Sequence, residues 1–175
     1  MRKCFLTTFM AVLLALSAMA QSNRVYIEDF EIEPGSTVTV PMILANETPT
    51  RGMQCNITLP PGLTVEDCTA NEYSLKQNMT LLSNFVDRDN CYTVLMYPYS
   101  RVGFPAGTNE VLTITFKAQP DFKGGTMKFW KCRGSNEDNT LIVMDDVSAT
   151  VTVPLNIMNE TNSTGDGFFQ LNNGF

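Results

Sequence analysis

Two pairs of acidic residues have the spacing that acid–base chemistry requires. Asp87 and Asp89 are separated by one residue, and Asp145 and Asp146 are adjacent. Paired carboxylates can serve as the general acid and the nucleophile or base of a glycoside hydrolase. Each pair, however, falls in a polar, acidic stretch that is typical of a solvated turn or strand edge. The chain also contains no histidine, the usual general base and metal ligand. The sequence therefore predicts a protein that is not an enzyme.

The same acidic stretch raises the question of calcium, because Asp87, Asp89 and Asn90 bring three oxygen-bearing side chains together. Arg88 interrupts this group, and no glycine gives the loop the sharp bend of a calcium-binding loop. Carboxylates that cap a turn explain the pattern more simply. The sequence predicts no metal and no cofactor.

Aromatic side chains are the better candidates for a binding site. Tyr97 and Tyr99 lie in the segment YTVLMYPYSRVGF, and Trp130 follows Phe129. If Met127 and Phe129 face the core, period-two alternation turns Trp130 outward, together with Lys128 and Cys132. An exposed tryptophan suits stacking on a sugar ring or anchoring a protein partner. The alternative is a Trp130 side chain that packs under a loop.

The first twenty residues have the features of a secretory signal peptide. Arg2 and Lys3 precede an apolar run that reaches Leu16, and Ala18-Met19-Ala20 supplies a small-x-small cleavage site. The run is too short to favour a membrane span. We expect cleavage after Ala20 and a protein that is secreted or held at the cell surface.

Charge excludes two classes of partner. The chain has 12 basic and 18 acidic residues, and loss of Arg2 and Lys3 leaves 10 against 18, a net charge of −8. A protein this acidic is a poor match for nucleic acid or for an anionic membrane surface.

Four cysteines remain after the predicted cleavage, namely Cys55, Cys68, Cys91 and Cys132. A secreted chain can oxidise them, and their spacing does not match a zinc site. Four cysteines allow three complete pairings, and the sequence does not choose among these or free thiols.

Short alternating runs with turn residues between them indicate an all-β fold. In residues 53–59, apolar side chains occupy every second position until Pro60-Pro61-Gly62 ends the strand. Residues 36–44 and 110–118 alternate in the same way, and 79–86 leaves a short helical turn open as an alternative. After Val153 the composition becomes rich in Asn, Gly, Ser and Thr, which favours a flexible tail over residues 154–175. We therefore expect one β-sandwich domain over 21–153.

The order of these strands and turns resembles a cohesin domain. The similarity is carried by four segments: IEPGSTVTVPMILANETP, GMQCNITLPPGLTVEDC, GTNEVLTITFKA and NEDNTLIVMDDVSATVTV. It covers about residues 24 to 153, and the chain is similar to cohesin-like modules of secreted Bacteroidetes proteins. Family 2 and 3 carbohydrate-binding modules share the same sandwich.

The resemblance implies a jelly-roll β-sandwich of about nine strands that recognises a ligand and performs no catalysis. Cohesins bind dockerin modules, so it implies protein–protein interaction as the function. The alternative is a carbohydrate-binding module that holds a polysaccharide, with Trp130, Tyr97 and Tyr99 as the candidate ligand-binding residues.

Overall fold

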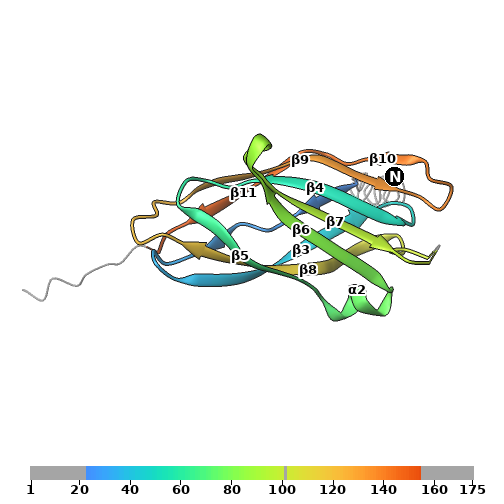
Figure 1. Cartoon of the computed structure of the whole chain (residues 1–175), viewed down its shortest axis with the longest axis horizontal. Coiled ribbons are helices and arrows are strands. Elements are labelled where there is room, and N and C mark those ends of the chain that lie inside the picture. Colours follow the sequence, from blue (N-terminus) through green and yellow to red (C-terminus); the bar gives the residue numbers. More distant parts are fainter. Residues whose placement is uncertain (1–22, 101, 155–175) are drawn as a thin grey trace, which may run out of the picture.

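In the computed structural model, which describes residues 23–100 and 102–154, two β-sheets pack face to face (Figure 1). The elements in chain order are β1 (Arg24–Tyr26), β2 (Phe30–Glu31), β3 (Thr37–Asn46), β4 (Gly52–Thr58), β5 (Leu63–Ala70), α2 (Glu72–Lys76), β6 (Met79–Val86), the 3₁₀ turn η1 (Asp87–Asp89), β7 (Cys91–Pro98), β8 (Gly107–Ala118), β9 (Gly125–Ser135), β10 (Leu141–Val143) and β11 (Val147–Thr152). The all-β sandwich predicted from the alternating runs is confirmed.

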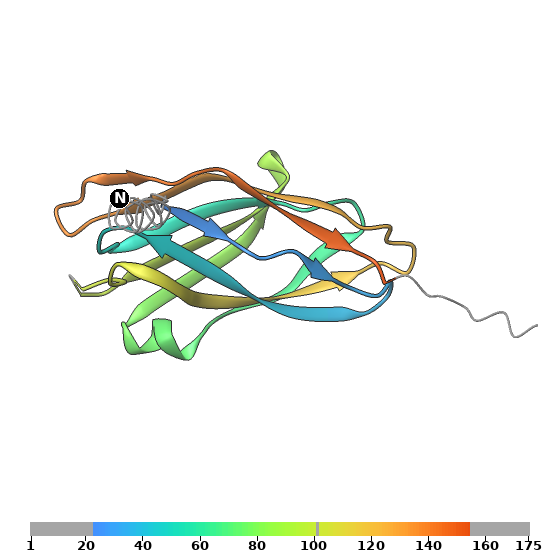
Figure 2. The same cartoon turned by 180° about the vertical axis from the view of Figure 1, so that it is seen from behind.

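The smaller sheet has the strand order β1-β3-β8-β5, and the larger sheet has the order β2-β11-β9-β4-β7-β6 with β10 paired to β9. All the pairings are antiparallel except the one between β2 and β11. The edge strands β5 and β6 lie on one side of the sandwich (Figure 1). On the opposite side, β1 pairs with β3 of the smaller sheet, and β2, which follows it closely in the sequence, pairs with β11 of the larger sheet (Figure 2).

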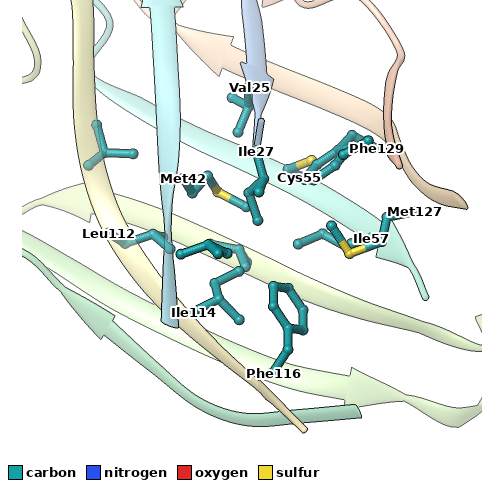
Figure 3. Packing of buried hydrophobic residues seen from close by; sticks show 14 of the residues in the cluster. Val25, Ile27, Met42, Cys55, Ile57, Leu112, Ile114, Phe116, Met127 and Phe129 are labelled. Carbon is teal, nitrogen blue, oxygen red and sulfur yellow. The ribbon is translucent and has the colours of Figure 1, made fainter. Parts of the chain in front are cut away.

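Period-two alternation fills the space between the sheets. Along β8, Leu112, Ile114 and Phe116 are fully buried, and the buried residues Cys55 and Ile57 of β4 face them from the other sheet (Figure 3). Phe116 stacks on Phe30 with 5.5 Å between the ring centroids and 15° between the ring planes. These large apolar side chains hold the two sheets together.

The structure differs from the sequence prediction in the number and ends of the strands. Within the described residues there are eleven strands, where about nine were expected. The expected strand over residues 24–32 is split between the two sheets, and the closing segment forms both β10 and β11. Residues 79–86, left open in the sequence, form the strand β6.

The helix α2 is one element that alternation did not predict. Asn71 caps it by accepting a hydrogen bond from the Ser74 backbone N–H, and the buried Ser74 hydroxyl donates to the Val111 carbonyl. Asn71 followed by Glu72 is the local signal for such a start. None of the helices that the structure describes is long and apolar enough to cross a membrane.

Candidate binding surface

The outer face of the smaller sheet is covered by threonine side chains. The Thr39 and Thr115 hydroxyls lie 2.8 Å apart, and those of Thr69 and Thr113 lie 3.1 Å apart. These hydroxyls hydrogen-bond one another across the strands, so the face is polar and largely satisfied.

The outer face of the larger sheet has a different character. The strand register aligns Leu82 of β6, Leu95 of β7, Gln54 of β4 and Arg133 of β9 in one row across four strands. We call these four residues the Leu82–Arg133 row. Leu82 is 53% exposed, although it is a large apolar side chain. None of the ion pairs among the described residues involves Arg133. The row therefore offers apolar area at one end and an available cation at the other.

A shallow hollow of about 240 Å³ opens beside this row. It is lined by Gly52, Met53, Gln54, Leu95, Met96, Tyr97, Arg133, Gly134 and Ser135. A Cβ atom at Gly52 would lie 3.0 Å from the Met96 carbonyl oxygen, so the glycine keeps this hollow open. Its size and lining suit an apolar or aromatic side chain presented by another molecule.

Tyr97 lines the hollow, and Tyr99 lies next to it. Their ring centroids are 6.0 Å apart with the planes at 69°, and Tyr99 is 84% exposed. The rings therefore meet edge to face and do not form one flat platform. Ligand binding by Tyr97 and Tyr99 stays a prediction.

Trp130 lies on the same outer face, opposite Asn56 of β4. Its side chain is half-buried, its Nε1–H donates to the Thr58 hydroxyl at 3.0 Å, and the Lys131 ammonium lies 4.6 Å from the ring centroid. On β4, Gly52 lies beside Tyr97, and Asn56, four residues further along, lies opposite Trp130. Because a strand rises about 3.3 Å per residue, Trp130 lies roughly 13 Å from Tyr97 in the strand direction. The three predicted aromatics share a face but do not form one cluster.

A β-bulge that follows Trp130 explains why one prediction about its strand is wrong. Gln54 pairs with Arg133 and Asn56 pairs with Trp130, so two steps on β4 match three steps on β9. Lys131, at φ 51°, is in the left-handed region within this extra step. Cys132, expected outside by strict alternation, is consequently buried at 3% exposure.

Neither acidic pair lies in the Leu82–Arg133 row, and Asp146 of the second pair lines a separate hollow together with Lys128 and Trp130. Asp87 and Asp89 form the exposed turn η1, where Asp89 pairs with Arg88 at 3.3 Å and this contact lowers the pKa of Asp89. In the part of the chain that the structure describes, no group of three His, Cys, Asp or Glu side chains could hold a metal ion.

A larger apolar hollow of about 580 Å³ lies at the open side of the sandwich, between β5 and β6. Leu59, Pro60, Pro61, Gly62, Leu63, Thr64, Val65, Phe85, Asn90 and Tyr92 line it. The Tyr92 hydroxyl donates to Ser83 at 2.8 Å, and burial raises the pKa of Tyr92. This hollow lies at the strand edges and not on a sheet face, so it is separate from the Leu82–Arg133 row.

Sequence reasoning missed the row itself. Leu82 lies in the segment whose secondary structure the sequence left open, and Arg133 comes after the bulge. The neighbours of both residues depend on strand register, which alternation within a single strand does not provide.

The comparison with family models and the comparison with solved structures point to the same protein family. A family model described as the cohesin domain matches residues 24–153. A search of the curated proteins found no match. The chain is similar to the structure of a type I cohesin–dockerin complex from Clostridium thermocellum, with a TM-score of 0.60 and 17% identity over 76% of this chain and 99% of that one.

Two cohesins from other sources have the same fold. A non-cellulosomal cohesin from Archaeoglobus fulgidus has a TM-score of 0.62 and 15% identity over 76% of this chain and 91% of its own. A cohesin module from a family 33 glycoside hydrolase of Clostridium perfringens has a TM-score of 0.62 and 8% identity over 77% of this chain and all of its own. With the family model covering most of the sequence, the chain belongs to the cohesin domain family.

Proposed function

We propose that this chain is a secreted, non-catalytic module that binds a protein partner through the outer face of the larger sheet. The observation that carries this proposal is the Leu82–Arg133 row, with the hollow beside it. Apolar area, an open pocket and an available cation occur together there, whereas the opposite outer face carries hydrogen-bonded threonines.

The partner we propose is a dockerin module. Solved structures with this fold include a type I cohesin–dockerin complex from Clostridium thermocellum and a cohesin from Acetivibrio cellulolyticus in complex with a dockerin. On the present surface, such a partner would place an apolar side chain in the hollow beside Tyr97 and a carboxylate near Arg133. Burial of the apolar contacts would supply affinity, and the ion pair would fix orientation.

A polysaccharide is the second candidate ligand, and the exposure of Tyr99 is the observation in its favour. Two features count against a flat sugar-binding platform. The Tyr97 and Tyr99 planes are inclined at 69°, and the Lys131 ammonium covers one face of the Trp130 ring. We therefore rank the protein partner first.

A paired titration separates the two candidates. Trp130 is the only tryptophan in the chain, so its fluorescence reports events on this face. We expect at least one member of a panel of dockerin modules to bind with a micromolar or lower Kd, and soluble polysaccharides to bind more weakly than millimolar. Saturable polysaccharide binding without any dockerin binding would replace the first candidate with the second.

Trp130 is the predicted contact that a substitution can test most simply. Trp130→Ala should weaken partner binding about tenfold, or about 1.4 kcal/mol. Because the ring is half-buried and bonded to Thr58, the melting temperature should also fall by a few degrees. Trp130→Phe keeps a ring but loses the N–H donor, and it should retain most of the affinity. A large loss of thermal stability with unchanged affinity would make Trp130 a structural residue.

Secretion is part of the proposal. The N-terminal features support cleavage after Ala20, and both residues 1–20 and the proposed tail beyond Pro154 lie outside the described residues. N-terminal sequencing of the exported protein should begin at Gln21, and a mature chain that begins at Met1 would remove the argument for secretion.

A further inference from the structure

Two of the four cysteines in the described chain meet inside the sandwich. The Cys55 and Cys132 sulfur atoms are 2.7 Å apart, and both residues are buried. Atoms that are not bonded to each other pack best at about 3.5–4.0 Å. A disulfide holds its sulfurs about 2.05 Å apart, so bond formation requires a movement of less than about 1 Å.

The bulge in β9 is the reason that these sulfurs meet. Without the extra residue, Cys132 would point to the outer face with Trp130. With it, Cys132 turns inward beside Cys55, which lies between the paired positions Gln54 and Asn56 on the adjacent strand. Facing Cα atoms on antiparallel neighbours are about 4.5–5.5 Å apart, within the range of about 4.4–6.8 Å that a disulfide spans.

The other two cysteines lie in positions that do not suit pairing with each other. Cys68 on β5 pairs with the buried Ile114 and faces the space between the sheets. Cys91 on β7 points to the same side as Thr93, and its sulfur lies 3.9 Å from the Thr93 hydroxyl oxygen. Cys91 therefore lies on the outer side of the larger sheet. Each of the three complete pairings that the sequence left open contains two disulfides. The one that contains Cys55–Cys132 would also have to join Cys68 to Cys91, so none of the three is favoured.

We propose that Cys55 and Cys132 form a single disulfide in the exported protein, and that Cys68 and Cys91 remain thiols. Each of the two thiols loses its hydrogen and one Sγ–Sγ bond forms. Two electrons and two protons pass to the disulfide of a thiol–disulfide oxidoreductase, which leaves as a dithiol. The bond would join β4 to β9 at the bulge, two residues after Trp130.

The environment of the reduced pair indicates when oxidation occurs. The hydrogen bond between the two thiols, and then burial, raise the pKa of Cys55 well above its ordinary value. A thiol in this state is a poor nucleophile, and the folded sandwich hides it from an enzyme. Exchange should therefore take place while the chain folds after export, before β4 and β9 are covered.

Peptide mapping tests the pairing in the unmodified sequence. The chain is exported into an oxidising compartment, denatured without reductant, alkylated with iodoacetamide and digested with trypsin and Glu-C. Cleavage after Glu66 separates Cys55, in peptide 52–66, from Cys68, in peptide 67–72. We expect peptide 52–66 to be linked to dipeptide 132–133, with Cys68 and Cys91 alkylated. Four alkylated cysteines, or Cys55 linked to Cys68 or Cys91, would overturn the proposal.

Thermal unfolding supplies a second readout. The bond closes a loop that spans 77 positions, and its reduction should lower the melting temperature by about 10 °C. Reduction should have no such effect on the double variant Cys55→Ala/Cys132→Ala, whereas Cys68→Ala should respond as the unmodified protein does. An equal response of the double variant would contradict the pairing, and if that variant does not fold, the peptide map decides alone.

Discussion

Arginine in place of Leu82 should weaken partner binding at least a hundredfold, or about 2.7 kcal/mol, while the melting temperature stays within about 2 °C of the unmodified protein. Leu82 is half-exposed and lies beside Leu95, at the apolar end of the Leu82–Arg133 row. A long cation there would require burial of an unpaired charge when the partner docks. The folded protein alone would keep the arginine in water. Isothermal titration calorimetry with a bound partner, together with a thermal melt, measures both quantities.

The matched control for this change is Thr39→Arg. Thr39 is an exposed strand residue on the outer face of the smaller sheet, so it receives the same new side chain in a similar backbone setting. Affinity should change less than threefold. Loss of binding in Thr39→Arg but not in Leu82→Arg would move the docking surface to the other sheet.

Truncation of Phe116 to alanine should produce the largest loss of stability, about 3–5 kcal/mol in the free energy of unfolding. Phe116 has no exposed surface, stacks on Phe30, and lies between Val38 and Val65 on the neighbouring strands. Such a loss is a large fraction of the stability of a typical domain. Urea unfolding at low temperature gives the free energy from the midpoint and the slope.

The neighbouring residue supplies the control for Phe116. Thr115→Ala removes an outward side chain and its hydrogen bond to Thr39, which should cost about 1 kcal/mol. Equal losses for the two variants would contradict the assignment of alternate residues to the core and to the surface.

The class of fold could be predicted from the sequence because alternation within a strand is a local property. Leu112, Ile114 and Phe116 were expected to share a core face, and all three are fully buried. The division of residues 24–32 between the two sheets, and the division of the closing segment into β10 and β11, have no such signal. They depend on which strand is available as a neighbour, and only the assembled sandwich determines that.

The binding surface was predictable only in part, for a related reason. Alternation turned Trp130 outward, with packing under a loop as the alternative, and its half-buried ring lies on the outer face of the larger sheet. The Leu82–Arg133 row joins one residue from each of four strands, so it follows from register. The single extra residue in β9 reverses the direction of Cys132, which shows how one bulge defeats an alternation argument.

The most direct test of the proposed docking surface is a footprint of the bound partner by two-dimensional ¹⁵N NMR. Amide resonances of β6, β7, β4 and β9 around the Leu82–Arg133 row should shift when the partner is added, and those of β3 and β8 should stay in place. Shifts centred on the threonine face, or on the hollow between β5 and β6, would contradict the account.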